Sequence, residues 1–176
     1  MMSDTERFFT VISVKKFLCI LSVLCLVFLF SCTDNHTEQI VKEYSTAKEA
    51  AENCGLLPVD VLPEGYNISA YRTIYDMVYE TEYMSGEKIA VLRMVSDEYS
   101  TSNLSGFTDT ALHDVYTHSD GRVFEIETRE NVFSCEWQEK QGENVCNLSL
   151  VLLNGKAGEF ESMLAQTISY FGGETN

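Results

Sequence analysis

Alternation of apolar and polar residues runs through the second half of the chain and constrains its fold most strongly. Segments rich in Tyr, Ile, Val, Met and Thr follow this two-residue period, which is typical of strands with one buried face. Polar stretches with a glycine, at 85–87 and 119–121, separate neighbouring segments and favour tight hairpin turns. We therefore expect strands at residues 66–74, 76–84, 88–96, 111–118, 122–129, 131–138 and 144–153.

A helical period replaces this alternation on both sides of the expected strands. Ala157, Phe160, Leu164 and Ile168 fall on one helical face before Gly172-Gly173, and Thr46-Ala47-Lys48-Glu49 has the form of a capping box. These signals predict a C-terminal helix and a short helix near 47–54. The expected fold class is α+β: a meandering antiparallel sheet of about six or seven strands, with the C-terminal helix packed on one face.

Residues 17–30 form a run of 14 residues without a charge, preceded by Lys15-Lys16. As a helix this run would reach about 21 Å, which is short of the roughly 30 Å hydrocarbon core of a bilayer. A basic start, a short apolar run and a small residue before a break are typical of secretory signals. The sequence thus predicts a signal peptide at residues 1–31, with an uncleaved anchor as the alternative.

The break at the end of this run, Leu29-Phe30-Ser31-Cys32, resembles the lipobox of bacterial lipoproteins, although Phe30 is larger than the usual residue. The resemblance implies that Cys32 is lipidated, with palmitate among its acyl chains, and that the protein is held at the extracytoplasmic side of the cell membrane. Residues 32–44 would then form a polar tether, and residues 45–172 a single domain. Whether translation starts at Met1 or Val14 stays open, because Asp4 and Glu6 are unusual in a signal peptide.

Acidic residues dominate the chain, which has a formal net charge of −15. Residues 1–31 contain three basic and two acidic residues, so their removal leaves a net charge of −16. Such a surface repels the phosphate backbone of nucleic acids and gains no attraction to anionic lipid headgroups. We therefore expect no nucleic-acid partner, and a membrane attachment that depends on the acyl chains.

Three cysteines remain beyond Cys32: Cys54, Cys135 and Cys146. A hairpin turn between Lys140 and Gln141 would place Cys135 opposite Cys146 and would keep the apolar residues of both strands on one face. The sequence therefore predicts a Cys135–Cys146 disulfide, worth about 2–3 kcal/mol in an oxidising compartment. Two buried free thiols, or a bond from Cys54 to either cysteine, are the alternatives.

Several short segments resemble a family of extracytoplasmic bacterial domains of unknown function. Members occur in small lipoproteins and at the ends of anti-sigma-type membrane proteins. The resemblance spans about 45–171 and implies an antiparallel sheet with a C-terminal helix, but it brings no catalytic residues. It rests on Ala50-Ala51-Glu52 to Gly55, Leu62 to Tyr66, Arg93, Leu104-Ser105-Gly106, Glu136-Trp137, Leu148-Ser149-Leu150 and the closing helix.

Side chains with catalytic potential form no recognisable constellation. The chain has no G-x-S-x-G, no phosphate-binding glycine loop and no zinc spacing. His113 and His118 lie five apart on one expected strand, so they face opposite sides and cannot share a metal. We expect no enzyme activity, no cofactor and no metal. Weak candidates for ligand contacts are tyrosines that also suit a core: Tyr71, Tyr75, Tyr79 and Tyr83.

Together these patterns favour a membrane-anchored lipoprotein that acts as a non-catalytic binding or sensing module of the cell envelope. The alternative is a carrier that holds an acyl chain or peptide in a groove between the sheet and the C-terminal helix. An envelope protein, a peptide or a lipid is the expected partner in either case. The sequence identifies neither the pathway nor the oligomeric state.

Overall fold

A computed structural model of the chain describes residues 40–99, 103–106 and 112–173. The chain divides into two units, Met1–Glu38 and Gln39–Asn176, and all described residues belong to the second. The predicted signal peptide and the lipidation residue Cys32 therefore lie outside the described residues. Within the described part, no helix is both long enough and apolar enough to cross a membrane.

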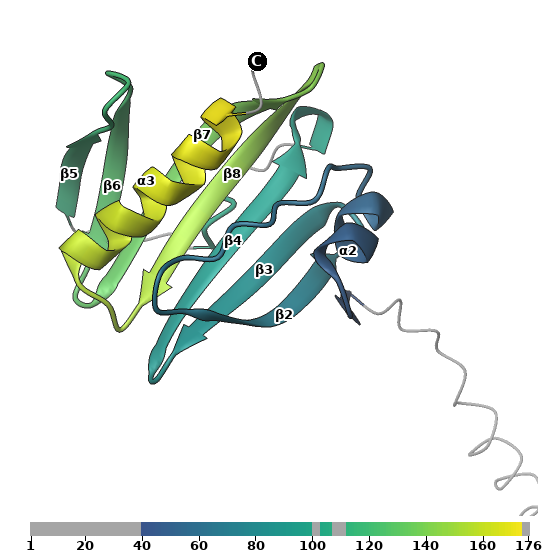
Figure 1. Cartoon of the computed structure of the whole chain (residues 1–176), viewed down its shortest axis with the longest axis horizontal. Helices are drawn as coiled ribbons and strands as arrows, with labels where there is room; N and C mark the ends of the chain where they lie inside the picture. The colour runs from purple at the N-terminus through teal and green to yellow at the C-terminus, as the bar shows by residue number, and fades with distance from the viewer. Residues whose placement is uncertain (1–39, 100–102, 107–111, 174–176) are drawn as a thin grey trace, which may run out of the picture. The chain divides into compact units, whose positions relative to one another are not determined.

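One antiparallel sheet contains the eight strands found among the described residues (Figure 1). Its spatial order is β1-β2-β3-β4-β8-β7-β6-β5, so β1 and β5 form the two edges. The connection from β4 to β5 therefore passes β8, β7 and β6 before it reaches the far edge. In chain order the strands are β1 Val41–Tyr44, β2 Asn67–Ile74, β3 Val78–Ser85, β4 Lys88–Ser96, β5 Leu112–Thr117, β6 Val123–Arg129, β7 Val132–Gln141 and β8 Asn144–Leu153.

The expected antiparallel sheet with a C-terminal helix is confirmed, but the sheet has one strand more than the upper expected number. The additional strand is β1, which lies within the stretch 32–44 that the sequence assigned to a tether. It pairs with β2 from Val41 opposite Ile74 to Tyr44 opposite Tyr71. None of its residues is buried. Because β1 is an exposed edge strand, its sequence carries little of the apolar signal that marks strands.

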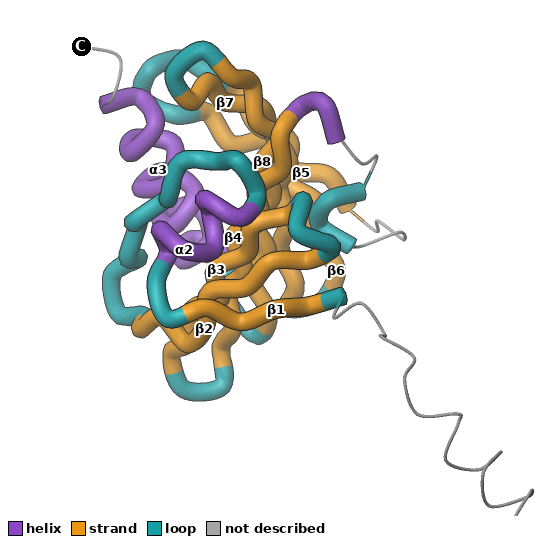
Figure 2. The backbone as a smooth tube through the Cα atoms, turned by 90° about the vertical axis from the view of Figure 1, so that its right-hand side faces the viewer, coloured by secondary structure: helices purple, strands orange, loops and turns teal. Residues whose placement is uncertain are grey.

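Two helices lie on one side of the sheet, α2 Ala47–Asn53 and α3 Ala157–Gly173 (Figure 2). Thr46 caps α2, because its Oγ1 accepts a hydrogen bond from the Glu49 N–H at 3.2 Å. The buried face of α3 packs onto β7 and β8, where the Phe160 and Phe133 rings stack 5.9 Å apart. Each fully buried side chain of this size stabilises the fold by about 1.5–3 kcal/mol.

The register of β7 and β8 differs from the predicted one. Cys135 lies opposite Leu150, and Cys146 lies opposite Glu139, so the two cysteines are offset by four residues. This offset corresponds to about 13 Å along a strand, whereas a disulfide needs Cα atoms within about 7 Å. The prediction of a Cys135–Cys146 pairing by register is therefore wrong, and both thiols are free and buried.

The turn explains this error. It lies at Gly142-Glu143, two residues beyond the expected position, and Gly142 adopts a positive φ of 65°. A tight hairpin turn needs this left-handed conformation, which glycine adopts without a steric penalty. A slip of four residues leaves every side chain on its original face, so the apolar pattern cannot distinguish the two registers.

Candidate interaction site

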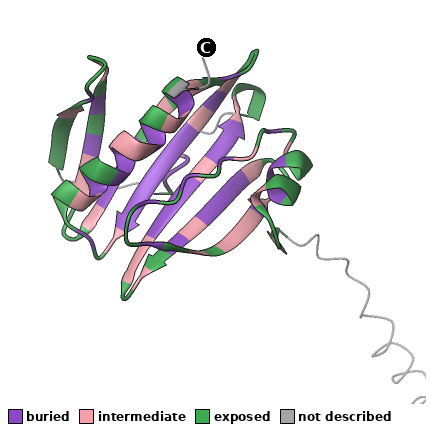
Figure 3. Cartoon of the chain, in the orientation of Figure 1, coloured by how far each residue is buried: buried purple, intermediate pink, exposed green. Residues whose placement is uncertain are grey.

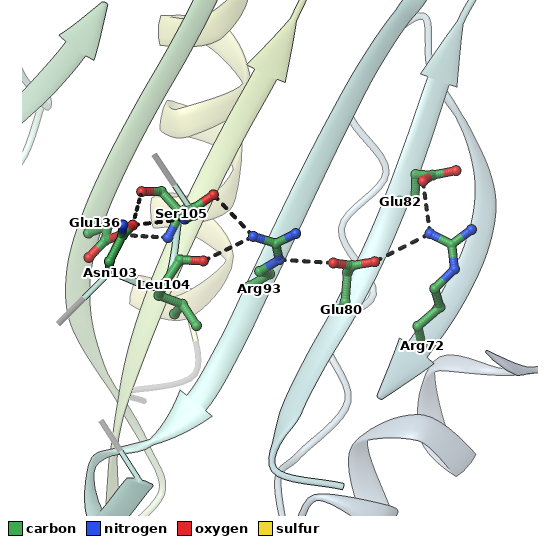
Figure 4. Close-up of polar contacts among 9 residues, drawn as sticks. Arg72, Glu80, Glu82, Arg93, Asn103, Leu104, Ser105 and Glu136 are labelled. Carbon is green, nitrogen blue, oxygen red and sulfur yellow. Dashed lines mark hydrogen bonds and ion pairs between the residues drawn. The ribbon is translucent and has the colours of Figure 1, made fainter. Parts of the chain in front are cut away.

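Glu80 of β3 occupies the centre of a charged network on the sheet face opposite α3 (Figure 4). Its side chain is only 8% exposed. Arg93 of β4 donates from Nε to Glu80 Oε2 at 2.9 Å, and Arg72 of β2 donates from Nη1 to Glu80 Oε1 at 3.3 Å. The register of the three strands places both arginines directly opposite Glu80. A buried carboxylate between two cations avoids the cost of an unpaired buried charge.

Arg72 extends this network towards the β1 edge. Its guanidinium donates from Nη1 to Glu82 Oε2 at 2.8 Å and from Nε to Glu43 Oε1 at 2.9 Å. The hydrogen bond to Glu82 is the main reason that the pKa of Arg72 is raised, and the same bond lowers the pKa of Glu82. Arg72 and Arg93 are thus both committed to neighbouring carboxylates. The network stabilises the sheet and leaves no open anion site here.

A second function of Arg93 is to hold the connection between β4 and β5 on this face. Arg93 Nη1 donates to the carbonyl oxygens of Leu104 and Ser105, both at 3.1 Å, and Glu136 Oε1 accepts the Ser105 N–H at 2.6 Å (Figure 4). We call this arrangement of Arg93 and Glu136 around the main chain of Leu104 and Ser105 the clamp. Because these three hydrogen bonds are made to backbone atoms of the connection, the clamp fixes the path of the chain.

Asn103 and Gly106 complete the bend held by the clamp. Asn103 Oδ1 accepts the Gly106 N–H at 2.9 Å and the Ser105 hydroxyl at 3.0 Å. Gly106 adopts a φ of 81°, and a Cβ at this position would lie 3.4 Å from Arg93 Nη1. The left-handed φ favours glycine here. Figure 2 places this segment on the opposite side of the sheet from α3, on the way to β5.

The hairpin of β5 and β6 is the most exposed part of the sheet (Figure 3). Only Glu127–Arg129 of β6 pair with β7, opposite Val132–Ser134. The inner side of β6 contributes Phe124 and Ile126 to the core. Three large apolar side chains of the hairpin remain in solvent: Leu112 at 67%, Val115 at 63% and Val123 at 65% exposure.

No strand of the described sheet pairs with the outer edge of β5, so alternate main-chain groups of β5 point away from the sheet. The His118 N–H donates to the Arg122 carbonyl at 2.9 Å, which marks this pair as hydrogen-bonded in the ladder. Hydrogen-bonded pairs alternate along an antiparallel ladder, so His113, Val115 and Thr117 direct their main-chain groups away from β6. Consistent with this assignment, the Val115 N–H donates at 2.8 Å to the side chain of Asp114, its own neighbour.

Two carboxylates of β6 lie beside the β5 edge. Glu125 lies opposite Val115, and Glu127 lies opposite His113. His113 Nδ1 lies 2.8 Å from Glu125 Oε1, whereas Glu127 has no ion-pair partner among the residues that the structure describes. The β5 edge therefore combines free backbone groups, exposed apolar side chains and negative charge.

The four tyrosines named from the sequence do not form one surface. Tyr79 and Tyr83 are core residues, and the Tyr79 hydroxyl donates to the Val59 carbonyl at 3.3 Å. Burial raises the pKa of Tyr79 to about 12. Tyr71 is half-buried, and Tyr75 is exposed in the turn after β2 with a φ of 54°. The four tyrosines thus form no shared accessible surface, and Tyr79 and Tyr83 are core residues.

His113 and His118 are separated as their spacing predicts, and each lies beside a different carboxylate. His118 Nδ1 lies 3.0 Å from Asp120 Oδ1. The pKa of Asp120 is lowered, mainly by the Arg122 N–H and then by the Arg122 side chain. Across residues 40–99, 103–106 and 112–173, no group of three or more His, Cys, Asp or Glu side chains is arranged to hold a metal ion.

The free thiols have little nucleophilic character. Burial raises the pKa of Cys135 to about 12, and burial together with the charge of Asp76 raises the pKa of Cys54 to about 11. The thiolate is the reactive form, so both side chains stay largely protonated near neutral pH. These cysteines therefore resemble packing residues more than redox-active ones.

The parts of the clamp were visible in the sequence only as separate fragments. Arg93, Leu104–Gly106 and Glu136 entered the family resemblance as separate short matches, and the structure brings them together in the clamp. Glu80 was missed because a charged residue in an alternating strand is typical of a solvated face. The glycine turn at 85–87 gave the missing signal, since its register pairs Glu80 with Arg93.

The space between α3 and the sheet is filled by buried side chains, among them Phe160, Leu164 and Ile168. An acyl chain or peptide could enter there only if this core opened, so nothing observed favours the carrier alternative. The exposed hairpin is consequently the strongest candidate for contact with another molecule. No family model, no curated protein and no solved structure matches this chain, and its function has to be inferred from the residues described above.

Proposed function

We propose that this chain is a lipid-anchored extracytoplasmic lipoprotein whose sheet domain binds an envelope partner through the β5–β6 hairpin, without catalysis. The observation that carries the proposal is the strand order, which places β1 and β5 at opposite edges of the sheet. The chain enters the domain at β1, and seven strand spacings of about 4.8 Å separate this edge from β5 by roughly 34 Å. The edge at which the chain enters the domain and the β5 edge are thus far apart within the domain, which leaves the hairpin available to a partner.

The entry end of the domain suits a position close to a bilayer. Ile40, Val41 and Tyr75 are exposed apolar residues around the start of β1, and the Tyr75 N–H donates to the Ile40 carbonyl at 2.7 Å. The nearby charges are paired, with Lys42 bonded to Asp76 and Arg72 bonded to Glu43. This end is therefore close to neutral although the whole chain is strongly acidic.

The hairpin differs from this end in its charge, which supports its assignment as the contact surface. Its apolar side chains lie in solvent, its outer strand has one neighbour in the described sheet, and one of its carboxylates lacks an ion pair there. Proteins usually protect such edges, because a free edge pairs with other chains. The β5 edge is open in the described sheet and, unlike the β1 edge, carries an unpaired carboxylate, so it suits a surface used for binding.

Metabolic labelling tests the anchor. Cells that express the full chain would be grown with an alkyne fatty acid, with Cys32→Ala as the control variant. We expect label on the unmodified chain in the membrane fraction, and a loss of label together with a shift to the soluble fraction for the variant. An unlabelled chain, or equal labelling of the variant, would refute the lipoprotein assignment.

Site-specific photo-crosslinking in intact cells tests the contact surface. A photoreactive amino acid would replace Val115 in the hairpin or, as a matched control, Met84, which is an exposed apolar residue at the end of β3. We expect a discrete crosslinked product from position 115 and none from position 84. Equal products at both positions, or none at 115, would contradict a role for the hairpin.

A further inference from the structure

We propose that the outer edge of β5 binds an extended, basic segment of an envelope protein, which adds to the sheet as a further strand. This inference rests on the proposed role of the hairpin and does not depend on the lipid anchor. The segment would bind by strand addition through main-chain hydrogen bonds, and it would be rich in Lys or Arg.

The main chain of β5 matches this mode. His113, Val115 and Thr117 direct their N–H and C=O groups outwards, in the alternating order that an incoming strand would pair with. Asp114 accepts the Val115 N–H at 2.8 Å, but this is a local bond on an exposed side chain. An incoming carbonyl oxygen could replace it at little cost, because one hydrogen bond is exchanged for another.

The side chains around the edge select the partner. Val115 and Val123 lie on the same face as Glu125 and Glu127, since Val115 pairs with Glu125 and Thr117 pairs with Val123. A Lys or Arg side chain on this face can cover the valines with its aliphatic stem and reach the carboxylates with its charged end. The geometry thus favours alternating basic residues in the bound segment.

Charge also disfavours a second copy of the same chain as the occupant. Two copies that paired along β5 would bring Asp114, Glu125 and Glu127 of one chain towards the same residues of the other, and each whole chain has a net charge of −15. Like charges across a strand pair are destabilising. A basic partner converts the same carboxylates into favourable contacts.

Peptide binding to the full chain, purified in a neutral detergent, tests the inference. The probes are two fluorescent peptides of equal length, one alternating Lys and Val and the other alternating Glu and Val. We expect saturable binding of the lysine peptide, weakened by salt, and no binding of the glutamate peptide. Equal binding of both peptides, or of neither, would overturn the proposal.

Val115→Pro tests the role of the main chain. Proline removes the outward N–H of Val115 but leaves the ladder to β6 intact, and proline is tolerated on edge strands when its nitrogen faces solvent. We expect about tenfold weaker binding, the equivalent of one lost main-chain hydrogen bond, with unchanged circular dichroism. Unchanged affinity in the folded variant would exclude strand addition at this edge.

A charge-reversal variant keeps the test decisive if Val115→Pro fails to fold. Glu125→Lys combined with Glu127→Lys changes two side chains on the face of β6 opposite the core and removes one exposed His113–Glu125 pair, so the strand should form as before. We expect this variant not to bind the lysine peptide and to bind the glutamate peptide instead. An unchanged preference would refute the proposed selection by charge.

The outcomes separate this inference from the proposed function. A crosslink at Val115 in cells without binding of the lysine peptide would refute the basic partner and leave the hairpin as a contact surface. Peptide binding by a chain that carries no lipid would support strand addition and refute the anchor. Concentration-dependent dimers that Val115→Pro abolishes would identify a second copy as the occupant and overturn the proposal.

Discussion

The central strands β3, β4 and β8 differ from the β5–β6 hairpin in how far their strands pair and in whether their glutamates form ion pairs. β4 pairs with β8 along its whole length, from Ile89 to Ser96, whereas β6 pairs with β7 only over Glu127–Arg129. In the central strands Glu80 is buried between two arginines. In the hairpin Glu127 has no ion pair within the described part of the chain.

This difference shows that acidic residues serve two purposes in one sheet. In the centre, the carboxylates of Glu80 and Glu82 join neighbouring strands, and their charge is balanced by the guanidinium groups of Arg72 and Arg93. At the β5 edge, carboxylates face solvent beside exposed apolar side chains and free main-chain groups. The central strands and the hairpin should therefore also differ in stability.

A phenylalanine in each region allows a direct comparison. Phe160→Ala removes a side chain that is fully buried between α3 and the sheet, and we expect a loss of about 3–5 kcal/mol in the free energy of unfolding. Phe124→Ala in the hairpin should cost about half as much, since the hairpin can relax around the cavity. Urea titrations measure both values. Equal losses would show that the hairpin belongs to the same rigid unit as the centre.

Glu80→Ala should have the next largest effect. It leaves Arg72 and Arg93 without their shared carboxylate, and we expect a loss of about 2–3 kcal/mol, less than for a fully buried pair because both arginines reach solvent. Glu80→Gln, which retains one acceptor oxygen, is the control and should lose less. If Glu80→Ala unfolds at the same urea concentration as the parent, the network does not hold the strands together.

Acid should weaken the central strands through Glu82. Its pKa is lowered by the hydrogen bond from Arg72, so its contribution to stability is present above its ordinary value near 4.5 and is lost as the pH falls through the lower, folded value. The urea concentration at the midpoint of unfolding should therefore decrease as the pH is lowered below about 4.5. Arg72→Met should flatten this part of the pH profile, and an equally steep profile would exclude the pair as its cause.

Surface changes on the hairpin should have the smallest effect. Val115→Thr and Val123→Thr replace exposed valines with polar side chains that also favour strands, so we expect changes below about 0.5 kcal/mol in the free energy of unfolding. Thermal denaturation followed by circular dichroism is the measurement. A loss above 1 kcal/mol would mean that these valines are covered by another part of the chain.

The strands were largely predictable because their two-residue period is strong wherever one face is buried. All seven expected strands were found. β1 was missed because Lys42 and Glu43 give it a polar sequence, and Tyr44 is the one β1 residue that packs against the core. Tyr75, named with three other tyrosines as a weak candidate for ligand contacts, adopts a left-handed conformation in the turn after β2, which no periodicity of the sequence indicates.

Pairings between residues far apart in the chain were harder to predict from the sequence. The register of β7 and β8 depends on where one glycine turns, and registers that differ by four residues bury the same side chains. The clamp depends on a contact between Arg93, Ser105 and Glu136, which come from different parts of the chain. Single residues of this kind have no local pattern, so only the folded topology identifies them as partners.

Hydrogen exchange of the β5 amides tests the central claim, that this edge is open for another strand. The N–H groups of Asp114 and Tyr116 face β6 and should be protected, whereas those of His113, Val115 and Thr117 face outwards and should exchange rapidly. The account predicts this alternation in the isolated full chain and its loss when the lysine peptide is bound. Protection of Val115 equal to that of Tyr116 without peptide would show that the edge is already covered, and would contradict the account.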